Sequence, residues 1–338
     1  MSEITRIAID TSKSVFTLHG VDGQDRAVLR RDLRRPDLVR FFEKLPPTEV
    51  VLEACGGSHH WGRTLQGLGH RVRLIPPQYV KPFVKRAKND RNDAEAISEA
   101  ASRPGMRHVA VKPAEQQAQC LLLSVRELLV GQRTQLVNAL RGHAAEFGLV
   151  APAGDKGLAQ LLADVAGDAS LPGAAAEALA LLGEEIARLE ARLAAVNARL
   201  LKQHKATPMS QLLSGIPGVG PMGALSFTLR VDPTQFESGR HFAAWVGLTP
   251  REHSSGGKQR MGGISRAGDE RLRQLLVLGA TAVIQHAKPG SKASAWLLSL
   301  LQRRPRKLAA VALANKMARI VWAMMMSGEE YRRPQAAT

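Results

Sequence analysis

The 338-residue sequence is poor in aromatic side chains and in cysteine. Phe, Trp and Tyr together supply 4% of the residues, too few for the stacked-ring platforms that many single-strand readers use. The two cysteines, Cys55 and Cys120, form neither a disulfide framework nor a metal-binding motif. This cysteine content indicates a reducing compartment, and we expect the protein to be cytoplasmic.

Long apolar runs are also missing. The longest run, residues 275–284, falls far short of the roughly 18 residues that a membrane helix needs. Residues 1–10 lack the basic stretch followed by an apolar stretch that is typical of a secretory leader. The sequence therefore predicts a protein that does not bind or cross a membrane.

Acidic residues are scarce relative to basic ones. The chain has 30 Asp and Glu against 47 Lys and Arg, a net charge of +17, which predicts a polyanionic partner. Residues 240–320 hold fifteen basic and three acidic residues, so most of the excess charge lies there. Such a region binds phosphates without sequence preference. With 44% hydrophobic residues, the chain should nevertheless fold into domains of the usual size.

Residues 1–110 have the pattern of a mixed α/β domain. Alternating apolar and polar residues predict an antiparallel meander, and the following strands alternate with helices. The expected strands are 4–10, 15–19, 27–33, 50–52 and 71–75, and the expected helices are 36–45, 60–68 and 90–101.

Residues 111–206 form a helical spacer in this interpretation. A helix is expected over 116–147, and the stretch 151–173, rich in Gly and Ala, should loosen the chain. Apolar residues then recur at alternating steps of three and four, as in a coiled-coil seam. The seam could join two copies of the chain or pack against helix 116–147 of the same chain; its residues are Leu179, Leu182, Ile186, Leu189, Leu193, Val196 and Leu200.

Four carboxylates stand at the ends of predicted elements. Asp10 and Glu53 each end a strand, and Asp90 and Asp93 open a helix. Each could be an ordinary cap, but together they could hold Mg²⁺, and two such ions about 4 Å apart clamp a phosphodiester. The order of these residues is the pattern of ribonuclease-H-like nucleases. Actin-like sugar kinases share the first strand, but their Asp-Gly-Thr phosphate loop is missing.

The region 207–330 should be mainly α-helical and contains two glycine-rich motifs. The segment 214–220 has the form of a helix-hairpin-helix, in which Gly218 and Gly220 would let the backbone approach a phosphate. An ordinary Gly-Pro turn remains the alternative. The second motif, Ser254-Ser255-Gly256-Gly257, predicts an exposed flexible loop. The loop is bracketed by four cations that could bind phosphate: Arg251, Lys258, Arg260 and Arg266.

A serine in this field of cations has two possible roles. It could donate a hydrogen bond to phosphate, or it could attack phosphorus while the cations stabilise the charge that develops. The residues alone leave both roles open.

These motifs together resemble the transposases of the insertion-sequence 110 family, and more narrowly its 1111 subgroup. Five segments carry the resemblance in order along the whole chain: Ile-Asp-x-Ser-Lys, Glu-Ala-Cys-Gly-Gly-Ser-His-His-Trp, Asn-Asp-x-x-Asp-Ala, Ile-Pro-Gly-Val-Gly, and Gly-Leu-Thr-Pro-Arg with His-Ser-Ser-Gly-Gly-Lys. The resemblance implies a RuvC-like DEDD domain at 1–110, a helical spacer at 111–206, and a transposase domain at 207–330.

The resemblance also implies roles for particular residues. Asp10, Glu53, Asp90 and Asp93 would be the catalytic, Mg²⁺-binding quartet, and Ser255 the catalytic serine, with Ser254 as its nearest rival. The implied partners are double-stranded DNA of the element ends and target, a structured bridge RNA that guides the choice of site, and further copies of the chain in a dimer or tetramer.

The expected function is therefore DNA cutting and rejoining through a serine-phosphate intermediate. The alternatives are a hydrolytic, junction-resolving endonuclease that uses water as the nucleophile, and a scaffold that binds nucleic acid without cutting it. The pair His59-His60 suggests zinc, but no further Cys or His is suitably spaced, so we expect a structural role for it.

Overall fold

The computed structural model describes residues 3–85, 89–288, 290–291 and 293–332. The chain divides into two compact units, Met1–Gln117 and Ala118–Thr338. Each unit has hydrophobic cores of its own.

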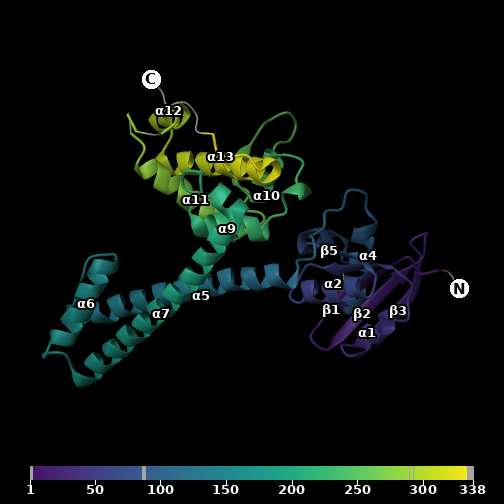
Figure 1. Cartoon of the computed structure of the whole chain (residues 1–338), viewed down its shortest axis with the longest axis horizontal. Helices are drawn as coiled ribbons and strands as arrows, with labels where there is room; N and C mark the ends of the chain where they lie inside the picture. The colour runs from purple at the N-terminus through teal and green to yellow at the C-terminus, as the bar shows by residue number, and fades with distance from the viewer. Residues whose placement is uncertain (1–2, 86–88, 289, 292, 333–338) are drawn as a thin grey trace. The chain divides into compact units, whose positions relative to one another are not determined.

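The first unit is built on a five-stranded mixed sheet (Figure 1). Its strands lie in the order β3-β2-β1-β4-β5, with β2 antiparallel to β1 and β3, and with β4 parallel to β1 and β5. The predicted meander and mixed α/β domain are confirmed. The strands are β1 (Arg6–Thr11), β2 (Val15–Val21), β3 (Ala27–Arg34), β4 (Glu49–Glu53) and β5 (Arg71–Ile75).

The two faces of the sheet carry different side chains, because successive residues of a strand point to opposite faces. Ile7 and Ile9 of β1 belong to the same core as residues of α1 (Asp37–Phe42) and α2 (Ser58–Gly67). Ala8 belongs instead to the core under α4 (Asp90–Ser102). Small residues on both β1 and α4 let this helix lie close to the sheet. The short α3 (Pro77–Val80) and η1 (Lys81–Phe83) lead toward α4.

The second unit starts with a helical hairpin made by α5 (Ala114–Ala145) and α7 (Gly173–Ala206). The expectation of a loosened chain over 151–173 is wrong, because α6 (Asp155–Gly167) occupies most of that stretch. Its apolar side chains pack with both long helices and offset the low helix propensity of the glycines. Arg133 of α5 also bridges Glu190 of α7 and Asp155 of α6.

Five of the seven heptad residues of α7 are buried within the chain, and the other two, Leu182 and Val196, are half-buried. Leu179 and Ile186 lie in one core with residues of α5 and α6, and Leu200 packs with Leu123 of α5. The second interpretation of the heptads, an intramolecular hairpin, therefore describes their packing. A seam that is already covered gives no support to self-association through the same residues.

The rest of the second unit is mainly helical, as the sequence predicts. The α11–α13 and α10–α13 pairs make up much of its packing, and α13 supplies seven buried side chains to one large core. The elements are α8 (Pro208–Leu213), α9 (Pro221–Arg230), η2 (Pro233–Gln235), α10 (Gly239–Trp245), β6 (Pro250–Glu252), β7 (Met261–Ile264), α11 (Glu270–Gln285), α12 (Ala295–Arg303) and α13 (Arg306–Ser327).

One helix in the described part of the chain, α13, is long and apolar enough to cross a membrane. The sequence alone did not point to it, because basic and polar residues interrupt its apolar run. Its burial in the core just described is the arrangement of a central helix in a globular domain. We therefore find no clear membrane segment among the described residues.

Gly218 lies in the turn between α8 and α9, where the backbone comes very close to α11. Its φ is +86°, and a Cβ on residue 218 would lie 2.6 Å from the carbonyl oxygen of Gly279. Gly279 would clash in return, because its own Cβ would lie 2.1 Å from the Gly218 oxygen. These two glycines are thus required for packing inside the domain. Gly220 has open space around it.

We predict that Gly218→Ala destabilises the protein by about 2–4 kcal/mol, because the new methyl group meets backbone and the residue must keep a positive φ. Gly220→Ser is the matched control. It also adds a Cβ, but into open space at the N-cap of α9, where serine is favourable, and its stability should change by less than about 1 kcal/mol. Urea denaturation of both variants measures the difference, and equal stabilities would contradict this packing.

Candidate active site

Asp10 and Glu53 meet at one edge of the sheet. Ile9 of β1 pairs with Leu52 of the parallel strand β4, so the residues that follow them, Asp10 and Glu53, end neighbouring strands side by side. Asp10 also pairs with Thr17 of β2. Both acidic residues are partly buried, and the short, apolar strands behind them fix their positions.

The N-terminus of α4 brings two more carboxylates to this edge. The Asn89 side chain caps the helix by accepting a hydrogen bond from the Asn92 backbone N–H. Asp90 and Asp93 lie in the first turn, where the helix dipole favours negative charge. One carboxylate oxygen from each of Asp10, Asp90 and Asp93 can be chosen so that all three lie within 4.8 Å of one another. That spacing suits a metal ion held by oxygen ligands.

Burial and mutual repulsion raise the pKa of Asp10 from 3.8 to about 6. Loss of solvent contributes most, followed by the negative charges of Asp93, Asp90 and Glu53. The predicted quartet is thus electrostatically one group, although Glu53 lies outside the closest three. A divalent cation would relieve both the repulsion and the cost of burial, so the residues fit Mg²⁺.

Thr11 and Cys55 form a contact beside the carboxylates. Next to the cluster, the Thr11 hydroxyl and the Cys55 thiol lie 3.2 Å apart and tie the end of β1 to the loop after β4. Sequence reasoning missed this contact because the partners are 44 residues apart.

His59 accepts a hydrogen bond from the Lys112 backbone N–H, and burial lowers its pKa to about 4. Among the described residues, neither His59 nor His60 belongs to a metal-binding group.

The serine motif lies at the tip of a β-hairpin. Strands β6 and β7 pair antiparallel, and the Lys258 backbone N–H donates to the Ser255 carbonyl oxygen. Between these two residues, Gly256 and Gly257 have φ of +55° and +76°, as a tight hairpin turn requires. The predicted loop is therefore exposed but built on paired strands, a correction that the two adjacent glycines could have signalled.

The two serines differ in their hydrogen bonds. The Ser254 hydroxyl donates to Glu252 Oε1 at 2.7 Å and accepts from the Arg260 backbone N–H at 3.2 Å. Within the described part of the chain, the Ser255 hydroxyl has no hydrogen-bond partner, and the residue is exposed. Ser254 thus holds the hairpin together, whereas Ser255 is available to an incoming group.

Four cations lie on this hairpin or just after it. The Arg251 guanidinium donates two hydrogen bonds to the Ser265 carbonyl oxygen and so braces the base of the hairpin. Lys258 and Arg260 flank the tip, and all three are exposed. Arg266 has a φ of +55° just after β7, unusual for a residue other than glycine. Of the two candidate phosphate-binding glycines, Gly218 has the packing role described above.

Comparison with known proteins identifies the family. The profile of the IS116/IS110/IS902 transposase family matches residues 210–295, and a DEDD transposase profile of IS110 matches residues 7–147. The chain is 42% identical, over 98% of its length and 92% of the relative, to the transposase for insertion sequence element IS1111A of Coxiella burnetii. It belongs to the IS110/IS116/IS902 family of transposases.

Further relatives cover nearly the whole chain. The identity is 53%, over 99% of this chain and 87% of the relative, to a Sinorhizobium fredii protein whose name describes it as a transposase, y4pF/y4sB. The chain is also 37% identical, over 98% of its length and 100% of the relative, to the transposase for insertion sequence element IS1328 of Yersinia enterocolitica. The resemblance inferred from the motifs is confirmed. The chain is an enzyme of a class that catalyses DNA strand transfer, and DNA is its partner.

We predict that Asp10→Asn stabilises the metal-free protein at pH 7.5. At that pH the Asp10 carboxylate is ionised although its pKa is raised to about 6, so its negative charge destabilises the folded state. The neutral Asn side chain removes this destabilisation. After allowance for solvent screening, the gain is about 1–2 kcal/mol. It should be full above pH 6 and vanish as the pH falls below 3.8, because the wild-type group is then neutral in the folded and unfolded states alike.

Thermal denaturation in the presence of a chelator measures this effect. Glu43→Gln, at the exposed end of α1, is the control and should give no such gain. Adding Mg²⁺ should raise the melting temperature of the wild type and leave that of Asp10→Asn nearly unchanged. An Asp10→Asn variant less stable than the wild type at pH 7.5 without metal would contradict the electrostatics described.

Proposed function

We propose that this transposase cuts and rejoins DNA through a covalent bond between Ser255 and a 5′-phosphate. The Ser255 Oγ attacks the scissile phosphorus, the Oγ–P bond forms, and the bond from phosphorus to the 3′ oxygen breaks. The proton lost by the serine is balanced, through solvent, by the proton that the 3′ oxygen gains. Rejoining reverses the step with a 3′-hydroxyl from another strand, so no external energy source is needed.

The observation that carries this proposal is the contrast between the two serines. The exposed Ser255 hydroxyl has no partner among the described residues and lies in a turn that carries Lys258, while Ser254 is engaged with Glu252. Cations near the tip would stabilise negative charge on the phosphate oxygens as phosphorus becomes five-coordinate. The turn leaves space around Ser255, because a Cβ at Gly256 or Gly257 would meet nothing within 4 Å.

We further propose a ribonuclease-H-like fold for the first unit, with Asp10, Glu53, Asp90 and Asp93 as the ligands of Mg²⁺, in a pair of ions. The mixed sheet and the carboxylates at the ends of β1 and β4 support the proposal. Transposases with this acidic set generally use divalent metal ions. Bound Mg²⁺ would polarise the phosphate and stabilise the leaving oxygen. Asp90 and Asp93 would orient the site from the rigid start of α4.

The remaining parts of the proposal concern domains and partners. We assign residues 1–110 to the nuclease-like domain, 111–206 to the spacer, and 207–330 to the transposase domain with a helix-hairpin-helix at α8 and α9. Gly220 is the position in this turn with room for a phosphate. A bridge RNA would supply sequence choice by base pairing, and the net charge of +17 supports two nucleic-acid partners. A dimer or tetramer would bring quartets and serines together.

Replacing Ser255 by alanine should abolish the covalent protein–DNA adduct, because no other hydroxyl is free at the turn. A duplex containing the joined ends of the element, incubated with RNA transcribed from its flanking DNA and Mg²⁺, is analysed on a denaturing gel. Ser254→Ala is the control: it loosens the hairpin but should retain most of the adduct. DNA binding should survive in both variants.

The outcome separates the proposal from its rival. Cleavage that persists in Ser255→Ala without any adduct would favour a junction-resolving endonuclease that uses water. An adduct that persists in Ser255→Ala but disappears in Ser254→Ala would move the nucleophile to Ser254. Binding without cleavage by the intact protein would favour a scaffold.

A further inference from the structure

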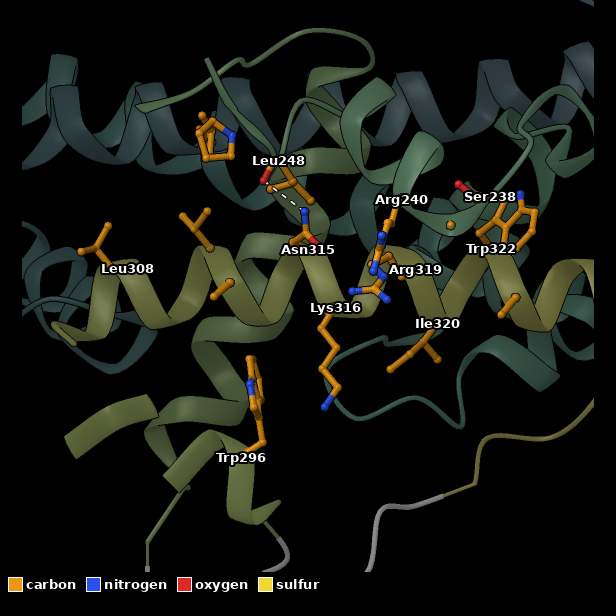
Figure 2. Close-up of a pocket in the computed structure, with 16 residues that line it drawn as sticks. Ser238, Arg240, Leu248, Trp296, Leu308, Asn315, Lys316, Arg319, Ile320 and Trp322 are labelled. Carbon is orange, nitrogen blue, oxygen red and sulfur yellow. Dashed lines mark hydrogen bonds between the residues drawn. The ribbon is translucent and has the colours of Figure 1, made fainter. Parts of the chain in front are cut away.

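A large groove lies beside the serine hairpin in the second unit (Figure 2). Its volume is about 1100 Å³, large enough for a ligand that is several atoms wide in each direction. Helix α13 forms the floor, with Leu308 at one end and Trp322 at the other. Trp296 of α12 and the start of α10 contribute the sides. The proposed function assigns no role to this groove.

Every charged residue that lines the groove is a cation. The three are Arg240, Lys316 and Arg319, and the described ion pairs of the chain include none of them. Gly239 packs so closely on α13 that a Cβ there would lie 3.1 Å from the Arg319 α-carbon, which places Arg240 beside Arg319. In the view of Figure 2 both side chains lie over α13. Cationic side chains gathered in one groove without a carboxylate repel one another and favour an anion.

The groove also offers an aromatic face and apolar walls. The Lys316 ammonium lies 4.4 Å from the centre of the Trp296 ring, so charge and ring are presented together. Leu308, Val311 and Ile320 also line the groove. A ligand that carries negative charge together with a flat apolar group would match this lining. An unpaired stretch of nucleic acid has both, in its phosphates and its bases.

The groove is continuous with the hairpin that carries Ser255. Pro250, the first residue of β6, and Ile264, the last residue of β7, line it. Asn315 of α13 donates a hydrogen bond to the Leu248 carbonyl oxygen, which fixes the approach to β6 on the groove floor. A strand lying in the groove would therefore run toward the base of the hairpin.

We propose that this groove binds a short unpaired segment of the nucleic-acid substrate next to the scissile phosphate. Arg240 and Arg319 bind its phosphates, and Trp296 stacks on one base. The inference rests on the proposed function in placing the cut at Ser255, but binding in the groove can be measured without cleavage. Low aromatic content excludes an extended stacking platform, and one ring in a cationic groove suffices for one base.

The test measures binding of fluorescein-labelled oligo-dT of ten nucleotides, and of a blunt 20-base-pair duplex, by fluorescence anisotropy with the full-length protein. Arg240→Ala and Arg319→Ala should each weaken oligo-dT binding about 5- to 10-fold. Each should also reduce the slope of log affinity against log salt concentration by about 0.7 for every phosphate that is no longer bound. Trp296→Ala should weaken binding about tenfold, and Trp296→Phe, which keeps a ring in this half-buried position, should retain most of the affinity.

Arg304→Ala is the matched control, since it removes an exposed cation of the same unit from outside the groove. It should change oligo-dT affinity less than twofold. Unchanged oligo-dT affinity in the groove variants, an equal loss in Arg304→Ala, or a loss for duplex as large as that for oligo-dT would overturn the proposal. If a second copy of the chain occupied the groove, the groove variants would bind oligo-dT with unchanged affinity. The wild type would then form a concentration-dependent dimer, and Arg319→Ala would dissociate it.

These outcomes are separable from those of the proposed function. Weakened oligo-dT binding in the groove variants, with no Ser255 adduct in the wild type, would support the groove and contradict the serine mechanism. An adduct that requires Ser255, with normal binding by all groove variants, would do the reverse.

Discussion

Repulsion among carboxylates at one sheet edge is the constraint on which the rest of the site depends. Asp10 is held at the end of β1 by the sheet, and α4 holds Asp90 and Asp93 against it. Small side chains on β1 and α4 permit this closeness, and the packing of the helix offsets the cost of crowding the charges. Because the carboxylates repel one another, a bound cation would lower the electrostatic energy of the site.

The second unit exposes the Ser255 hydroxyl while holding the turn that carries it in place. Paired strands, two glycines with positive φ and the Ser254–Glu252 hydrogen bond hold the turn, and Ser255 is left without a partner among the described residues. In the function we propose, the cations near the turn and along the neighbouring groove bind phosphate. The carboxylate cluster therefore lies in the first unit, and the serine hairpin with its cations lies in the second.

Patterns local in sequence predicted much of this architecture. The alternation around Ile7 and Ile9 was enough to place β1, and the helix that Asp90 and Asp93 open was also predicted. Contacts between distant residues were not predictable, because they depend on packing. The approach of Gly218 to Gly279 is of this kind, and for the heptads the sequence left open whether they pack on α5 or on a second copy of the chain. The groove was missed for the same reason, since its lining comes from several separate elements.

The most direct test of the metal site is the anomalous scattering of Mn²⁺ in crystals of the protein. The account predicts a peak among the carboxylates of Asp10, Asp90 and Asp93, with metal–oxygen distances of about 2.0–2.3 Å. The peak should disappear in crystals of Asp10→Asn. Occupancy elsewhere in the first unit, with these three carboxylates turned apart, would contradict it.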